Sequence, residues 1–265
     1  MKIIGLTLNG LNLMIADYFF TIKGLFDFDK NIVTNDLFID GQSFNRSKIN
    51  GKVLVLNGII KTWDPAKIAA LNQILYTGGI KPLVANIVGL GVLTAYVEVR
   101  SRAEGGDSRK ISMQLLMPDP YLYAQNTSTT NLSPVSGSGL NYPYTYPIVY
   151  GTVSGGWGSI SNAGNAIAYP VITITGACTN PVITNTTTGE AMTLNISLAQ
   201  TDALVIDCRP ATRSIKLNGT TNKIGVKTTA SKWPSCQPGV NNLTFVPATT
   251  GAGMSCSVAL TGRWV

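Results

Sequence analysis

The chain has 265 residues, of which 45% are hydrophobic and only 12% are charged, and it carries a net charge of +7 without any histidine. The absence of histidine excludes Ser/His/Asp and Cys/His triads in their usual form, histidine-ligated metals and the commonest general acid/base at neutral pH. The positive charge permits contact with nucleic acid or an acidic partner, but no polybasic run marks a dedicated nucleic-acid patch. A chain of this length has room for one large core or two small ones, and we expect two domains.

The first 60 residues contain short runs that predict β-strands. Apolar residues recur at every second position over 4–8 and again over 18–22, which is the period of a half-buried strand. The run 53–60 is almost continuously apolar and reads as a strand buried on both faces, with Asn57-Gly58 as a kink or bulge. We expect these strands to be joined as hairpins.

A single helix is expected, over residues 64–77. Asp64 offers an N-cap, Pro65 stands at the first helical position, and apolar residues recur at helical spacing until Gly78-Gly79. The apolar segment 80–99 contains charged residues, proline and glycines, so it reads as two strands and a turn rather than a membrane span. The N-terminus lacks a cleavage site after an unbroken apolar run, so we expect neither a signal peptide nor contact with a membrane.

Four basic residues lie on either side of a glycine pair, in and directly before the segment SRAEGGDSRK at 101–110. Its Gly-Gly centre predicts a long hairpin whose arms carry Arg100, Arg102, Arg109 and Lys110. Two interpretations stay open: a solvated hairpin tip, or a loop that projects into a partner or lines a channel through which a polyanion passes.

Two prolines in the segment 118–120 end the first unit, because proline interrupts both a sheet ladder and a helix. We therefore expect one domain over residues 1–119 and a second over 120–265. The stretch 120–165 reads as linker-like, and 126–139, which is almost entirely Ser, Thr, Asn and Gly, is expected to be a loop.

From residue 167 onward, short alternating runs separated by turn signals predict a β-sandwich. The clearest runs are 192–198, 204–208, 215–217 and 254–260, and an Asn-Gly turn follows the third.

No residue set for catalysis, a cofactor or a metal is present. The four cysteines form no C-x-x-C pair, and Cys208 and Cys256 fall in phase with apolar strand positions, so we expect buried, reduced thiols. The D-x-D-x-N sequence at 27–31 opens like a calcium loop, but Ile32 replaces its glycine and Phe38 its glutamate. The chain has no nucleotide-binding or nucleophile motif and few carboxylates in its second half, so we expect no enzyme, no cofactor and no metal.

Two tryptophans, Trp157 and Trp233, are candidate glycan contacts. A tryptophan exposed on a β-sandwich can stack against a pyranose ring, because the apolar face of a sugar packs on an aromatic ring. The alternative is that both residues belong to a core or an interface. A tyrosine- and proline-rich stretch at 142–150 is a further candidate contact surface, with edge-strand packing as its alternative.

Parts of the second half resemble the distal tail (Dit) proteins of siphophages, which are bacteriophages with long non-contractile tails. The residues that carry the resemblance are Asn180-Pro181, the Thr188-Gly189 turn, the strand ending at Asp207, the Asn218-Gly219 turn and the W-x-x-x-x-P-G-x-N-x-L-x-F pattern from Trp233 to Phe245. The N-terminal hairpins around one helix fit the same family more loosely. The resemblance implies a mainly β fold: a ring-forming N-terminal β domain with one helix, and a C-terminal galectin-like or carbohydrate-module-like β-sandwich. In some members the final strand returns to the first domain, so the resemblance leaves two assignments open for residues 254–265, the N-terminal domain or the sandwich.

The resemblance also implies a non-enzymatic structural role. Dit proteins form a homo-hexameric ring, single or double, that joins the tail tube to the tail tip or baseplate and lets DNA pass without sequence-specific binding. The implied partners are the tail tube protein, the tail-tip hub or tail-associated protein and the tape measure protein, and the implied location is the virion tail tip after assembly in the host cytoplasm. Some of the four basic residues would then face the lumen or an adjoining ring. Two alternatives stay open: a carbohydrate-binding host-adhesion module, and another tail structural protein such as a tube subunit.

Overall fold

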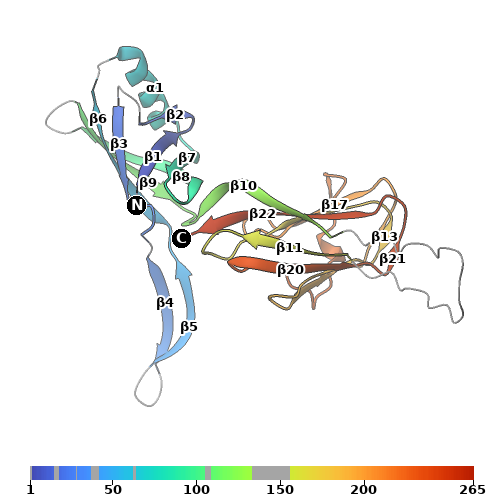
Figure 1. Cartoon of the computed structure of the whole chain (residues 1–265). Coiled ribbons are helices and arrows are strands. Elements are labelled where there is room, and N and C mark those ends of the chain that lie inside the picture. The colour runs from blue at the N-terminus through green and yellow to red at the C-terminus, as the bar shows by residue number, and fades with distance from the viewer. Residues whose placement is uncertain are drawn as a thin grey trace, which may run out of the picture. The chain divides into compact units, whose positions relative to one another are not determined.

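The computed structural model describes residues 2–14, 18–27, 29–36, 42–61, 64–104, 109–132 and 156–265. These residues are mainly β, as predicted, with one α-helix among them (Figure 1). The chain divides into two compact units, unit 1 with Met1–Gln125 and Trp264–Val265, and unit 2 with Asn126–Arg263. The chain leaves unit 1 along β10 (Leu122–Asn131) and returns to it along β22 (Ser255–Trp264).

Unit 1 is built from two antiparallel sheets that share one long strand. Besides the parts of β10 and β22 that it contains, its strands are β1 (Ile3–Leu8), β2 (Leu11–Asn12), β3 (Tyr18–Lys23), β4 (Lys30–Asp36), β5 (Gln42–Ile49), β6 (Lys52–Ile60), β7 (Lys81–Ile87), β8 (Gly91–Glu104) and β9 (Lys110–Met117), and β8 is the shared strand. The first half of β8 pairs with β7, which pairs with β1, while its second half pairs with β9, followed by β6 and β3. The register of β8 against β9 shifts between Val99 and Ser101, which leaves Arg100 as the extra residue of a bulge. Strands β4 and β5 form a separate two-stranded sheet (Figure 1).

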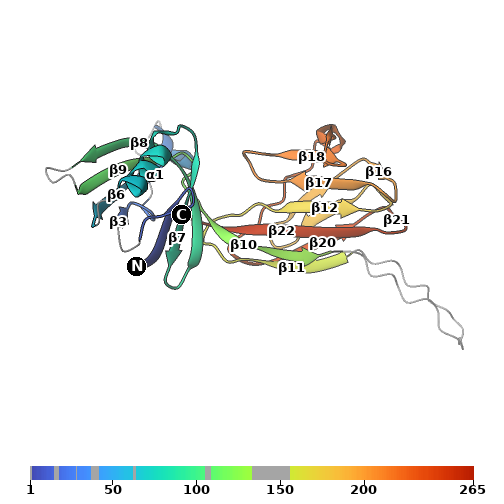
Figure 2. The same cartoon turned by 90° about the horizontal axis from the view of Figure 1, so that it is seen from above.

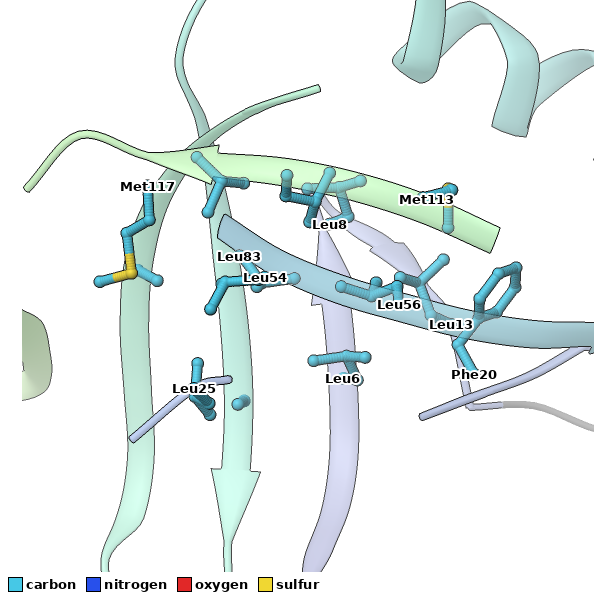
Figure 3. Packing of buried hydrophobic residues seen from close by; sticks show 14 of the residues in the cluster. Leu6, Leu8, Leu13, Phe20, Leu25, Leu54, Leu56, Leu83, Met113 and Met117 are labelled. Carbon is cyan, nitrogen blue, oxygen red and sulfur yellow. The ribbon is translucent and has the colours of Figure 1, made fainter. Parts of the chain in front are cut away.

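The core of unit 1 consists of the inward side chains of both sheets. Figure 3 shows Leu6, Leu8 and Leu83 of one sheet gathered with Leu54 and Leu56 of the other. Each of these five leucines is at most 1% exposed, because alternate positions of a half-buried strand face the core.

Strand β6 differs from its prediction in two respects. The run was expected to be buried on both faces, but Val53 is 37% and Ile59 48% exposed, because only one face of this sheet packs on the core. No kink or bulge occurs at Gly58, where the register against both neighbours is regular. The glycine is needed for another reason: a Cβ atom there would lie 2.1 Å from Cδ1 of Phe20, whose ring packs directly over Gly58.

The predicted helix is confirmed as α1 (Pro65–Tyr76). The side chain of Asp64 accepts a hydrogen bond of 2.9 Å from the backbone N–H two residues further on. Beyond the other end, Nζ of the buried Lys81 donates to the carbonyl oxygens of the C-cap residue Thr77 and of Gly79. No described helix is long and apolar enough to cross a membrane.

Unit 2 is a β-sandwich. Its strands, besides the parts of β10 and β22 that it contains, are β11 (Gly156–Asn162), β12 (Val171–Thr175), β13 (Cys178–Thr179), β14 (Val182–Asn185), β15 (Glu190–Thr193), β16 (Ser197–Leu198), β17 (Ala203–Asp207), β18 (Ser214–Leu217), β19 (Thr221–Asn222), β20 (Gly239–Val246) and β21 (Thr249–Thr250). One layer runs β19-β18-β17-β12-β22, and Figure 2 looks onto it. The other layer is the four-stranded sheet β11-β20-β14-β15, and a small sheet joins β16, β13 and β21.

In unit 2, the expected Asn-Gly turn is confirmed and two other expectations are wrong. Asn218 and Gly219 both have positive φ, 52° and 76°, as the tight turn requires. The run 192–198 is not one strand but two, β15 and β16, which belong to different sheets. Residues 126–131 belong to strand β10 rather than to a loop, and 133–155, including the tyrosine-rich stretch, lie outside the described residues.

Candidate assembly and binding surfaces

The outward face of β3, β6 and β9 in unit 1 carries an apolar groove of about 420 Å³. Its walls include Phe19 and Ile59, which are 44% and 48% exposed. Lys110 borders the groove, and the ammonium of Lys61 lies 5.7 Å from the ring centroid of Phe19. The sequences of these three strands contain no aspartate or glutamate. We call this surface, which is apolar with a cationic border, the groove face.

The structure places the four basic residues in different surroundings. Arg100 is exposed at the β8 bulge, whereas the guanidinium of Arg102 donates a hydrogen bond to the side chain of Asn72 in α1. Arg109 and Lys110 are exposed at the start of β9, where Lys110 lies opposite Ile59. The hairpin centre at 105–108 lies outside the described residues. The two residues at the start of β9 therefore adjoin the groove face, while Arg102 is directed to the helix.

The two tryptophans also differ. Trp157 lies in β11, opposite Thr244 of β20, and is 78% exposed. Trp233 is half-buried against the core of unit 2, and the guanidinium carbon of Arg213 lies 5.6 Å from its ring centroid. Trp157 thus offers an open ring, and Trp233 covers the edge of the core.

A buried asparagine near the start of β20 organises the segment that leads into this strand, which the sequence marked only by the W-x-x-x-x-P-G-x-N-x-L-x-F pattern. The side-chain oxygen of Asn241 accepts from the backbone N–H of Gln237 at 2.9 Å, and its amide nitrogen donates to the carbonyl oxygens of Gln237 and Gly239 at 2.7 and 3.1 Å. Asn185 of β14 donates to the carbonyl of Ser235 at 2.6 Å and to the Asn241 side chain at 3.3 Å. Asparagine at the third position after the Pro in the family pattern was the available signal, because its side chain bonds to local backbone.

A lysine ammonium is bound at the start of the calcium-like segment. Nζ of Lys52 donates to the backbone carbonyl oxygens of Leu25 and Asp27 at 2.6 and 3.0 Å. Burial lowers the pKa of Lys52, and the nearby Asp27 carboxylate opposes this. Among the described residues, no group of three or more His, Cys, Asp or Glu side chains is placed to hold a metal.

The four cysteines are free and buried. Burial raises the pKa of Cys236 and of Cys256 to about 12, and raises the pKa of Cys208 further above its usual range. Since the thiolate is the reactive form, these thiols are inert core residues at neutral pH.

The described residues thus form a helix-bearing β unit and a β-sandwich, each with an exposed surface available for contact. Comparison with known proteins specifies the class. Residues 163–264 match the family model described as siphovirus-type tail component, C-terminal domain, of the SPP1 Dit type. That segment belongs to this family, as the sequence resemblance predicted.

The fold likeness extends over the whole chain. The crystal structure of SPP1 Dit (gp 19.1), described as a paradigm of the hub adsorption apparatus in phages that infect Gram-positive bacteria, is 13% identical and superposes with a TM-score of 0.72, covering 98% of this chain and 99% of that one. A chain of the phage p2 baseplate in its activated conformation with Ca is 10% identical, with a TM-score of 0.50 and coverage of 95% and 92%. No curated protein matches in sequence. Residues 163–264 thus carry a siphovirus-type tail-component domain, and the chain as a whole has the fold of SPP1 Dit.

Proposed function

We propose that this protein is the distal tail hub of a siphophage. Its copies form a hexameric ring, single or double, that joins the tail tube to the tail tip or baseplate, and DNA passes through the lumen without sequence-specific binding. The observation that carries the proposal is the end-to-end likeness to SPP1 Dit, which covers 98% of this chain and 99% of that one. In this role the partners are further copies of the chain, the tail tube protein, the tail-tip hub or tail-associated protein and the tape measure protein. Assembly takes place in the host cytoplasm, and the protein then functions in the virion.

The groove face supports a ring contact. A closed ring uses heterologous contacts, in which one surface of a subunit meets a different surface of the next. Phe19 and Ile59 leave apolar area in water on a groove of about 420 Å³, and burial of such area favours association. The separate β4–β5 sheet also supports a contact between subunits. An isolated two-stranded hairpin is marginally stable in water, and packing against an adjacent subunit would stabilise it.

The basic residues support contact with polyanion or with a second ring. Arg100, Arg109 and Lys110 are exposed. In the proposed ring, some of these residues and Arg102 face the lumen, where cations attract phosphate, or an adjoining ring. An image of the assembled ring that places all four on the outer rim would contradict this assignment.

Native mass spectrometry of Ile59→Asp and of a matched control tests the ring contact. The control is Ile224→Asp in unit 2, because Ile224 is 47% exposed and Ile59 is 48%. We expect the wild type and Ile224→Asp to give a hexamer or a double hexamer, and Ile59→Asp to give mainly monomer with an unchanged circular dichroism spectrum. The carboxylate would be desolvated in the contact, which costs several kcal/mol per charge.

Two results would overturn the proposal. A wild-type protein that stays strictly monomeric at high concentration would exclude the ring, and an intact Ile59→Asp hexamer would exclude the groove face from the contact. Negative-stain images of the wild type separate the hub from a tube subunit, since the hub gives closed rings and a tube subunit gives long tubes.

A further inference from the structure

The outward side of the sheet β11-β20-β14-β15 in unit 2 is an uncharged surface, which we call the neutral face. Along these strands, buried and exposed positions alternate, so each strand turns one row of side chains to the core and one row away from it. The outward rows hold serine, threonine, asparagine, valine, alanine and a single tryptophan. The only charged residue in the four strands is Glu190, and its carboxylate accepts hydrogen bonds from the backbone N–H and hydroxyl of Ser235.

Trp157 is the one aromatic residue on the neutral face. It is 78% exposed, and none of the described residues stacks on its ring or places a cation over it. Hydrogen-bonding side chains lie next to it in register: Thr244 directly opposite, and Ser159 opposite Asn242 two positions further along β11. An open indole ring is thus bordered by hydroxyl and amide groups on a rigid sheet.

We propose that the neutral face binds an uncharged polysaccharide, with Trp157 as the platform on which a pyranose ring stacks. A pyranose presents an apolar C–H face together with equatorial hydroxyl groups, and the indole ring and the polar side chains of Thr244, Ser159 and Asn242 complement both. The absence of any cation from the four strands disfavours phosphate-bearing polymers, which are bound through lysine and arginine. Rows of hydroxyl and amide groups interrupt the apolar residues, so the face lacks the contiguous apolar centre of a stable protein interface.

This surface belongs to unit 2, whereas the groove face belongs to unit 1, so substitutions can alter one surface without changing the residues of the other. Glycan recognition would give the tail hub a direct contact with an uncharged polymer of the host surface. Ring formation and glycan binding are therefore tested by different variants and different measurements.

Affinity electrophoresis tests the proposal. The full-length protein is run through native gels containing dextran, mannan, xylan or a soluble β-glucan, with heparin as a charged comparison. We expect at least one uncharged polysaccharide to retard the wild type, and Trp157→Ala to weaken that binding about tenfold, the factor that loss of an aromatic stacking contact produces. Trp157→Phe should keep part of the retardation. Tyr76→Ala is the matched control, because Tyr76 is an 81% exposed aromatic residue in unit 1.

Three results would overturn the proposal. The first is no retardation by any uncharged polysaccharide at high concentration. The second is retardation that Trp157→Ala leaves unchanged or that Tyr76→Ala abolishes equally. The third is a change in the oligomer distribution of Trp157→Ala in native mass spectra, which would make the neutral face a contact between copies of the chain. Because Trp157 is 78% exposed, the alanine variant should retain the wild-type melting temperature, and equal melting curves verify this.

Discussion

Replacement of Asn241 by alanine should unfold unit 2 at markedly lower denaturant concentration. The side chain is 0% exposed and takes part in four hydrogen bonds of 2.7 to 3.3 Å, three of them with the backbone of Gln237 and Gly239. Each net hydrogen bond contributes about 1 kcal/mol, and a buried N–H left without an acceptor costs more. Allowing for partial relaxation of the segment, we expect the free energy of unfolding to fall by about 3 kcal/mol.

Urea unfolding followed by tryptophan fluorescence measures this loss, because Trp233 precedes Gln237 in the same segment and reports on unit 2. A loss of this size corresponds to a shift of about 1 M or more in the urea midpoint at unchanged slope. Asn242→Ala is the matched control, since Asn242 is the next residue but lies on the exposed side of β20, and it should change stability by less than about 0.5 kcal/mol. A loss below about 1 kcal/mol in Asn241→Ala, or an equal loss in the control, would refute the assignment of Asn241 as the clamp of this turn.

Two further predictions concern packing and pH. Gly58→Ala should lower the melting temperature of unit 1 through a loss of about 1–3 kcal/mol, because its Cβ would lie 2.1 Å from the ring of Phe20; Gly78→Ala, with no atom within 4 Å, should not, and equal melting of the two variants would contradict the reasoning. Burial raises the pKa of Asp207, but hydrogen bonds from Arg209 outweigh it and the folded pKa lies below the usual value. Asp207 therefore stabilises unit 2 above the unfolded pKa of about 4, and this contribution is lost as the pH falls through the folded value. Urea midpoints at pH 3 and pH 7 should differ less for Asp207→Asn than for the wild type, and parallel pH profiles would refute the role of the ionised carboxylate.

Alternation in the sequence predicted which side chains face a core, but not which strands are neighbours. The run 192–198 keeps its period of two throughout, yet the strand breaks between β15 and β16 because backbone groups there bond elsewhere. The N–H of Asn195 donates to the carbonyl of Val226, and the carbonyl of Ile196 accepts from the N–H of Asn180. Long-range partners of this kind leave no local pattern, so the division into two sheets could not be read from the run itself.

The candidate surfaces were only partly predictable for a related reason. Trp157 is followed in the sequence by glycine and Trp233 by proline, so the local sequence marks both as parts of a turn-prone segment. In the structure the side chain of Trp157 is exposed, whereas that of Trp233 packs against the core of unit 2. Their exposure depends on where each lies in the folded unit, Trp157 on the outward side of strand β11 and Trp233 in an irregular segment packed against the core. The indispensable role of Gly58 was hidden too, because it depends on Phe20, a residue 38 positions away that lies opposite Gly58 only in the folded sheet.

The error at β6 bears on function as well as on fold. Its apolar run was read as burial on both faces within the chain, whereas the chain buries one face and leaves Val53 and Ile59 in water. A strand can be apolar on both faces because one face packs on the core and the other packs against another subunit. A strand with more apolar residues than the monomer buries therefore indicates an assembly surface. The neutral face of unit 2 has the opposite composition, because its outward rows are mostly hydroxyl and amide groups around one tryptophan. Unit 1 therefore has the surface suited to self-assembly, and unit 2 the surface suited to a hydrated, uncharged ligand.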